Sequence, residues 1–305
     1  MQTGESIKVV FHHADDEACP FCPGEKEKPW VTFEGEKNKS GILRDAMNDP
    51  TRCNYAQQSG ARPKDGKDGR QNPDPVKPTP QPIFSHSQYG EYSNQAHHSI
   101  SGNEIMKGHK IEKIIKKENG SDFLGDTGYT INNCANGVYL PAYPKKFGGI
   151  WGKAIYPKEY PLADGKKITI TNAADDDTFK FLVMKPAMER IGQAHIGGHE
   201  GFYLETLEKF YPDYPASVKE KLDEIADKVY LKSQECPFCV ESNGKPKKPY
   251  LPPYKINQML DNLSKRIEKK LTCPPDQWPY FISKFSKDYV VRSKGVTSKK
   301  HLLTM

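Results

Sequence analysis

The motif Cys-Pro-Phe-Cys occurs twice in this chain of 305 residues, once near each end, at residues 19–22 and 236–239. Each copy is followed by a lysine, a proline and an aromatic residue, at 28–30 and at 248–250. A Cys-x2-Cys turn aims both sulfurs at one ion, and two such turns complete a tetrahedral site. We therefore predict one structural Zn²⁺ bound by Cys19, Cys22, Cys236 and Cys239. This ion would join the two ends of the chain and close a very long loop.

Other interpretations of these cysteines remain open. The pairs could be redox-active, although no βαβ context surrounds either one. They could instead be disulfides in an oxidising compartment, or four unrelated thiols. A site of four thiolates has no open position, so its zinc would be structural rather than catalytic. Cys53, Cys134 and Cys273 are predicted to be single buried thiols.

Composition divides the chain into four segments. Residues 59–82 contain glycine, proline, lysine, aspartate and glutamine with almost no large apolar residue, which is typical of a linker or an extended surface strap. We therefore expect an N-terminal arm at 1–58, the linker at 59–82, a central core at 83–212 and a basic helical region at 213–305. With 25 prolines and 24 glycines, much of the chain is expected to be loop.

Hydrophobic periodicity gives a coarse map of secondary structure. Helices are predicted at 40–48, 103–118, 216–233 (with Ser217 and Glu220 as a capping box) and 255–271. Strands are predicted at 7–11, 30–33 and in 129–141, and a hairpin is predicted from 166–172 and 178–184 around the acidic residues 175–177. Residues 142–165 are predicted to be loops, and 187–194 and 200–211 to be helical turns.

Charge is distributed unevenly along the chain. The formal net charge is +6, yet residues 245–305 hold 14 Lys+Arg and 4 Asp+Glu, so the rest of the chain is slightly acidic. A basic segment of this kind suits either a phosphate-binding surface or an ordinary solvated face. No apolar run approaches eighteen residues, so no transmembrane helix is expected. The N-terminus also lacks the pattern of a signal peptide, and we expect synthesis in the cytoplasm.

Histidines gather at two places in the central segment. His97 and His98 are adjacent, and His195 and His199 stand four apart, a spacing that puts two imidazoles on one face of a helical turn. Between them, Asn136-Gly137 is a turn dipeptide that runs into a short apolar strand. Taken singly, each feature has an ordinary structural explanation. His97 and His98 could be a surface pair, His195 and His199 a pair at a helix end, and Asn136-Gly137 a simple turn. His12, His13, His86, His109 and His301 are predicted to be surface histidines, with His109 a minor candidate for the site.

In this order, the three blocks resemble the AHH family of the HNH/endonuclease VII superfamily, whose members are often the nuclease tips of bacterial toxins. The blocks are Ala96-His97-His98, Asn-Gly-x-x-Leu-Pro at 136–141, and His195-x-Gly197-x-His199 followed by Tyr203. The resemblance covers roughly residues 90–210, with long spacings that indicate insertions. It implies a ββα-metal (His-Me finger) nuclease core with helical and loop insertions. Together with the four-cysteine zinc site predicted above, which would join the terminal segments, this predicts an α+β protein.

The resemblance also implies roles for these residues. His98 would be the general base that deprotonates the attacking water, while His97, His195 and His199 would bind one catalytic divalent metal. Asn136 would hold the loop between the two strands and so orient His98. Exchanging the roles of His97 and His98 would leave the sequence argument unchanged. Imidazole ligands suit Zn²⁺ or Ni²⁺, and open water positions would also admit Mg²⁺ or Mn²⁺.

The function implied is metal-dependent, largely sequence-non-specific cleavage of DNA by an antibacterial toxin or effector. Its partners would be DNA, a cognate immunity protein and a secretion-system carrier, with no membrane. It would be made in the bacterial cytoplasm, secreted without a cleaved signal peptide, and active in the target-cell cytoplasm. Phosphate contacts are expected from the lysines near 145–158, Arg190 and residues 245–300, with Tyr203 and Trp151 as stacking or packing residues. The rivals are an RNase of the same fold and a non-enzymatic, zinc-stapled nucleic-acid-binding or adaptor protein.

Overall fold

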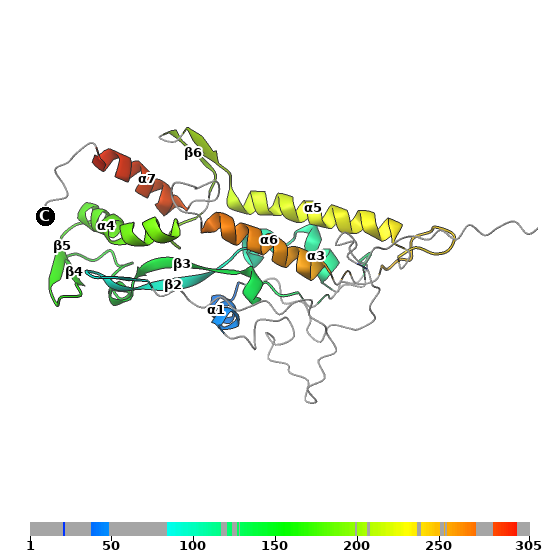
Figure 1. Ribbon diagram of the computed structural model, residues 1–305, viewed down its shortest axis with the longest axis horizontal. Helices are drawn as coiled ribbons and strands as arrows, with labels where there is room; N and C mark the ends of the chain where they lie inside the picture. The colour runs from blue at the N-terminus through cyan, green and yellow to red at the C-terminus, as the bar shows by residue number, and fades with distance from the viewer. Residues whose placement is uncertain are drawn as a thin grey trace, which may run out of the picture.

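Two antiparallel strands, β2 (Gly90–His98) and β3 (Gly137–Pro144), form the centre of the computed structural model (Figure 1). Their register pairs His98 with Gly137 at one end and Tyr92 with Pro144 at the other. The short strand β1 (Ser85–His86) adds to β2, and two further hairpins lie outside this sheet. The structure describes residues 21, 38–48, 84–116, 121–123, 127, 129–198, 200–205, 208–236, 239–250, 253, 255–272 and 283–297. Over these residues the chain is an α+β protein, as predicted.

Helices cover both faces of the β2–β3 pair (Figure 1). The helix α1 (Ser40–Asn48) packs on one face, where Leu43 and Met47 form a small cluster with Ala96 and Tyr139. On the other face, α5 (Tyr214–Glu235) and α6 (Ile256–Leu271) pack with α3 (Lys110–Ile115) around a larger core that includes Val138 and Leu140. Strand β3 thus lies between the two clusters, because its successive side chains point to opposite faces.

A second large core fills the other end of the sheet. It joins β2 and the 3₁₀ turn η4 (Lys145–Phe147) to α4 (Ala173–Ile191) and to two small hairpins. The hairpins are β4 (Lys158–Pro161) with β5 (Lys167–Ile170), and β6 (Phe202–Leu204) with β7 (Lys209–Tyr211). The helix α7 (Lys284–Thr297) packs beside α4 through Phe285, which stacks on Phe181. No helix among the described residues is long and apolar enough to span a membrane.

The predicted helices at 40–48 and 255–271 are confirmed as α1 and α6. The predicted helix at 216–233 is also confirmed, as α5, but the capping box is wrong. Asp213 caps α5 through a bond from the Ala216 N–H to its side chain, so Ser217 and Glu220 lie inside the helix. The predicted strands at 7–11 and 30–33, and the linker at 59–82, lie outside the described residues.

The predicted hairpin at 166–184 is wrong in its second half. Residues 167–170 do form a strand, but its partner is β4, whereas 173–191 form α4. Asn172 caps this helix by accepting the Asp175 N–H, and Asp175 and Asp176 lie in its first turn. Acidic side chains are favourable there because of the helix dipole. The acidic run is therefore a helix start and not a turn between strands.

Three other predictions differ from the structure. The predicted helix at 103–118 is divided into a π-helix, η2 (Gly102–Met106), and α3, because Gly108 between them has a φ of +73°. Residues 200–211, predicted to be helical turns, contain the β6–β7 hairpin. Residues 142–165, predicted to be loops, contain the end of β3 and all of β4.

The pair Asn136-Gly137 lies where a turn runs into a strand, as predicted, but it does not form a hairpin turn. Asn136 ends the 3₁₀ turn η3 (Cys134–Asn136), and Gly137 has an extended backbone with a φ of −114°. Glycine is required here for space, because a Cβ atom would lie 2.3 Å from the Met47 sulfur. The absence of a side chain at 137 lets α1 approach the start of β3.

Two of the minor predictions also fail. His109 is not a surface residue: its side chain is 8% exposed, caps α3 by accepting the Ile111 N–H, and has its Nε2 3.3 Å from Asp223. Cys134 is disulfide-bonded rather than a single thiol, and its partner lies outside the described residues. Cys53 and Cys273 also lie outside them.

Candidate functional site

A pocket of about 760 Å³ lies where β2 ends and is lined by His97, His98 and His195. Its walls come from α1 and the residues before it, from η2, from the segment 195–200 and from the start of α5. These segments are far apart in the sequence, so the fold brings the predicted histidines together. His199 lies outside the described residues.

The adjacent histidines face different neighbours because they end a β-strand, where successive side chains point to opposite faces. His97 faces His195, with ring centroids 5.2 Å apart, and the buried Tyr214 ring lies 6.1 Å away. His98 is 5% exposed, and its Nε2 lies 2.9 Å from Oδ1 of Asn132. The two neighbouring rings therefore have separate surroundings within one pocket.

The residues after His98 are held by Asn136, which is fully buried. Its Oδ1 accepts the Ile100 N–H at 2.7 Å, and its Nδ2 donates to the carbonyls of Ile100 at 2.9 Å and Ile131 at 2.8 Å. The Ser264 hydroxyl of α6 also donates to Oδ1, at 2.9 Å. These bonds fix the backbone that leaves β2 directly after the two histidines.

Two further contacts fix the same backbone. The Asn136 carbonyl accepts the Ser99 N–H at 2.8 Å. The Tyr214 hydroxyl donates to the Ser99 carbonyl and lies 3.4 Å from that of His98. Burial raises the pKa of Tyr214 far above its usual range, so the hydroxyl remains a donor.

His195 follows α4, whose C-cap is Gly192 with a φ of +81°. Its backbone N–H donates to the Pro141 carbonyl of β3 at 2.8 Å, which attaches this segment to the central strand. Gly197 also has a positive φ, of +78°, and residues 193–198 are not helical. The helical turn predicted from the spacing of His195 and His199 is therefore wrong over the described part of this segment.

The electrostatics of the pocket favour neutral imidazoles. Burial lowers the pKa of His98, and His195 lowers it further, while the bond to Asn132 acts in the opposite direction. Burial likewise lowers the pKa of His195. Both rings are thus mostly unprotonated at pH 7, the form that can accept a proton or bind a metal ion.

Two imidazoles of the pocket lie at a spacing that is compatible with one shared metal ion. Two imidazoles bonded tetrahedrally to one ion at about 2.0–2.1 Å have ring centroids roughly 5 Å apart, which the His97–His195 pair matches. Glu104, Glu200 and Asp213 also line the pocket. Among the described residues, no group of three or more His, Cys, Asp or Glu is close enough to hold an ion. A complete shell would need a further ligand, and His199 is the predicted one.

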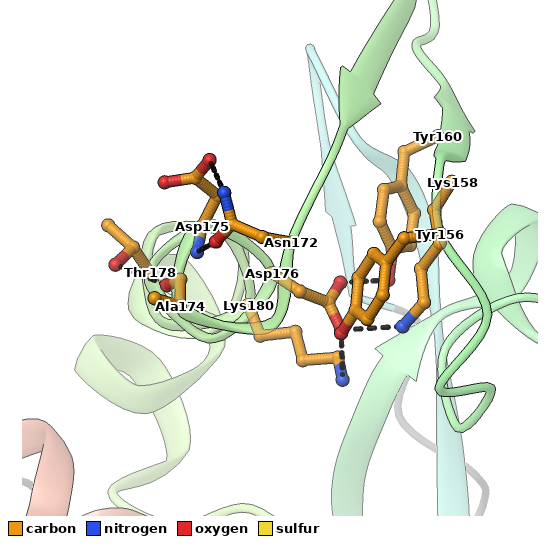
Figure 2. Close-up of polar contacts among 9 residues, drawn as sticks. All are labelled: Tyr156, Lys158, Tyr160, Asn172, Ala174, Asp175, Asp176, Thr178 and Lys180. Atoms are coloured by element: carbon orange, nitrogen blue, oxygen red, sulfur yellow. Dashed lines mark hydrogen bonds and ion pairs between the residues drawn. The ribbon is translucent and has the colours of Figure 1, made fainter.

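The predicted phosphate-binding lysines at 145–158 are not at this pocket. They follow β3 at the end of the sheet opposite to the histidines. Lys158 is 3% exposed and lies 2.5 Å from Asp176, which also binds Tyr160 and Lys180 (Figure 2). The Lys158 ammonium is therefore buried in an ion pair with Asp176 and is not available to bind a phosphate.

The remaining predicted contact residues also do not line the pocket. Trp151 packs against Phe147 and Tyr143 near this opposite end, and Arg190 lies over the Phe84 ring. Tyr203 is 55% exposed on the β6–β7 hairpin, directly across from the exposed Phe210. The cation that does line the pocket is Arg44 of α1, which the sequence did not single out.

Asn132 is the main residue of the pocket region that the sequence analysis missed. It is 1% exposed and lies two residues before η3 begins. The only sequence signal was the density of asparagines at 132, 133 and 136, because its contacts with Lys39 and His98 are long-range. Comparison of this chain with protein-family models, with curated proteins and with solved structures finds no match.

Proposed function

We propose that the chain is a metal-dependent endonuclease that cleaves DNA at the His97/His98/His195 pocket, with little sequence specificity. The observation that carries this proposal is the convergence of three histidines from two distant segments in one pocket, with His97 beside His195 and His98 held separately. The AHH-like motifs of the sequence agree with it. An α-helix, α4, follows the β2–β3 pair after the β4–β5 insertion, which is compatible with an enlarged ββα-metal core.

In this proposal, His98 accepts the proton of the water that attacks the phosphorus atom. Its low pKa keeps the lone pair available near neutral pH. His97 and His195, with His199, would hold one divalent ion, and such an ion would supply positive charge at the scissile phosphate and the leaving oxygen. Asn136 and Tyr214 hold the backbone after His98, so that its ring keeps one position. Arg44, which pairs with Asp45 at 2.9 Å, lines the pocket and would contact the phosphate backbone.

Plasmid cleavage tests this function. Purified protein is incubated with supercoiled DNA, with a chelator and then with added Mg²⁺, Mn²⁺, Ni²⁺ or Zn²⁺. His98→Ala should lose cleavage by roughly 100-fold or more. His86→Ala is a matched control, because His86 stacks on Tyr89 at the far end of the sheet. Full activity of His98→Ala, with a normal fold by circular dichroism, would contradict the proposal.

The same assay separates the rival functions. Structured RNA and single-stranded RNA are given as alternative substrates under the same conditions, and preferential RNA cleavage would indicate an RNase of the same fold. Binding of DNA or RNA without cleavage by any metal-loaded form would indicate a nucleic-acid-binding or adaptor protein. Its role as an antibacterial toxin or effector, with an immunity protein and a secretion carrier, stays a proposal carried by the sequence resemblance. Growth arrest of bacteria expressing wild type, but not His98→Ala, would support it.

We also propose that Cys19, Cys22, Cys236 and Cys239 bind one structural Zn²⁺. Cys236 and Cys239 are both buried, and the Cys239 N–H donates to the Cys236 carbonyl at 2.7 Å, which closes a tight turn. Cys19 and Cys22 lie outside the described residues, but Phe21 between them is described and 3% exposed. It belongs to the same core cluster as Cys236 and Cys239, which supports a shared site.

Metal analysis tests the zinc site independently of activity. Co²⁺-substituted protein should show thiolate-to-metal absorption, and Cys239→Ser should weaken it while leaving any histidine-bound ion in place. A mass measurement under denaturing, non-reducing conditions that finds disulfides at these four cysteines would contradict it.

A further inference from the structure

The orientation of the Asn132 side chain is fixed by a backbone contact. The Lys39 N–H donates to Oδ1 of Asn132 at 2.9 Å. A backbone N–H can only donate, so the atom that faces it must be the amide oxygen and not the amide nitrogen. The hydrogen bond from Lys39 therefore identifies which atom of the Asn132 carboxamide is the oxygen.

The same oxygen lies 2.9 Å from Nε2 of His98. Because a carboxamide oxygen only accepts, Nε2 must carry the proton of this hydrogen bond. A neutral imidazole has one N–H and one lone pair, so the lone pair of His98 is on Nδ1. Two bonds to one oxygen thus define the tautomer of the ring.

We propose that Asn132 is a positioning residue that holds His98 as its Nε2–H tautomer, so that Nδ1 is the nitrogen that accepts a proton from water. This inference rests on the proposed nuclease function and adds a residue to it. When Nδ1 gains the proton, Nε2–H still donates to Asn132, and the bond becomes charge-assisted. Asn132 therefore both selects the reactive nitrogen and stabilises the imidazolium that forms.

The residues before α1 make this arrangement rigid. Lys39 holds the Asn132 oxygen, and the neighbouring Asn38 accepts the Gly102 N–H at 2.7 Å and donates to the Ser101 hydroxyl at 3.0 Å. Asn38 thus contacts the chain after His98, and Lys39 contacts the residue that orients its ring. The residues that precede α1 therefore hold both the backbone that follows His98 and the side chain that bonds to its ring.

Nitrogen NMR of the imidazoles tests the proposal directly. The protein is labelled with ¹⁵N-histidine, and the His98 signals are identified by their loss in His98→Gln. Wild type at neutral to mildly basic pH should show one neutral tautomer, with a pyrrole-like Nε2 and a pyridine-like Nδ1. Asn132→Leu removes the acceptor, and its His98 signals should shift towards a mixture of tautomers. Asn132→Asp keeps an acceptor oxygen and should restore the Nε2–H form.

Kinetics then connect the tautomer to function. Asn132→Leu should lower kcat roughly 100-fold with little change in KM, because proton transfer and not substrate binding is impaired. Asn133→Ala is a matched control in the same loop. Its side chain accepts the Asn136 N–H and donates to the Thr130 carbonyl, so the variant should lose stability while the tautomer of His98 is kept.

The outcomes distinguish this inference from the proposed function. A wild-type spectrum with Nδ1 protonated, or with mixed tautomers, would overturn the role of Asn132 whether or not DNA is cleaved. This measurement does not depend on whether Asn132→Leu folds. A single Nε2–H tautomer in a protein that cleaves nothing would refute the nuclease function and, with it, the catalytic use of Nδ1. Wild-type kcat in a folded Asn132→Leu variant would also overturn the proposal.

Discussion

Asn136 shows how one side chain can fix the backbone of a site. Its carboxamide makes bonds to Ile100, Ile131 and Ser264, and each of these contacts is buried. In Asn136→Ala these groups would lose their partners, and an unsatisfied buried group costs about 1–3 kcal/mol. We expect Asn136→Ala to lower the free energy of unfolding by roughly 2–5 kcal/mol in urea denaturation.

The control for this variant is Asn243→Ala, which removes an asparagine from an exposed turn. It should change the free energy of unfolding by less than about 1 kcal/mol. Equal losses in the two variants would mean that the bonds of Asn136 add nothing beyond an ordinary surface turn.

The histidines of the pocket could be chosen from the sequence, but their environments could not. The motif order selected His97, His98, Asn136 and His195, and the fold brings all four to the end of β2 and the start of β3. The separate surroundings of His97 and His98 follow from strand alternation. Asn132 was missed because its partners are 34 and 93 positions away in the chain. No local pattern encodes such contacts.

Among the elements, helices with a continuous apolar face could be predicted from the sequence. Helices whose apolar pattern is interrupted by charged residues or proline could not. The helix α6 was found because its buried residues recur at helical spacing, and its register needs no other information. The segment that forms α4 contains an acidic first turn and an internal Pro186, which obscured its helical pattern. There the tertiary contacts of Asp176 help to place the helix start, and the local sequence pattern alone favoured a hairpin instead.

The contact of α1 with β3 depends on the small size of Gly137. A Cβ atom there would lie 2.3 Å from the Met47 sulfur and 2.9 Å from Leu43 Cδ1, both buried in the same cluster. Gly137→Ala should therefore displace α1 and lower the free energy of unfolding by roughly 1–3 kcal/mol. Gly149→Ala is the control, since nothing lies within 4 Å of the added atom. Thermal denaturation of the two variants measures the difference, and an unchanged melting temperature in Gly137→Ala would contradict the packing argument.

Asp176 joins α4 to the β4–β5 hairpin. Its carboxylate lies 2.5 Å from Lys158 and 2.8 Å from Lys180, and it accepts the Tyr160 hydroxyl at 2.6 Å (Figure 2). Asp176→Asn would leave Lys158 buried without its counter-charge, so we expect a loss of about 3–5 kcal/mol. Asp175→Asn, at an exposed position of the same turn, should cost only about 0.3–1 kcal/mol. Similar losses in both variants, measured by urea denaturation, would contradict this view.

The same carboxylate gives a pH dependence. Burial by itself would raise the pKa of Asp176, but the hydrogen bonds from Lys158, Lys180 and Tyr160 outweigh it and lower the pKa to about 2. An unfolded aspartate has a pKa of about 3.9. A lowered pKa contributes stability that is complete above about pH 4 and is lost as the pH falls towards about 2. Wild type should therefore lose more stability than Asp176→Asn across this window, and parallel curves would contradict the assignment.

At the scale of the whole molecule, the sequence indicated that the two ends of the chain are connected, and Phe21 supports this. Its ring stacks on Phe123, with centroids 6.2 Å apart, and Phe123 in turn contacts Tyr230 and Tyr250. The predicted strands at 7–11 and 30–33 flank this residue but lie outside the described residues. The repeated Cys-Pro-Phe-Cys motif predicted that the segments around residues 21 and 236–250 lie close together. The aromatic cluster through which they pack could not be predicted from the sequence.

Phe21→Ala should test how much this long-range contact contributes. Phe21 is 3% exposed, and removal of a buried phenylalanine costs about 3–5 kcal/mol. Phe210→Ala is the control, because Phe210 is 62% exposed on its hairpin and should cost less than about 1 kcal/mol. If Phe21→Ala unfolds at the same urea concentration as wild type, this segment does not contribute to the stability of the core.

The position of Phe21 has a consequence for the order of events during synthesis. A ribosome adds roughly 5–20 residues per second, so Phe21 emerges roughly 10–50 seconds before Tyr250 does. Phe21 stacks on Phe123, which also contacts Tyr230 and Tyr250, so this aromatic cluster cannot be complete until then. Phe21 therefore completes its packing only after residues 22–249 have been synthesised.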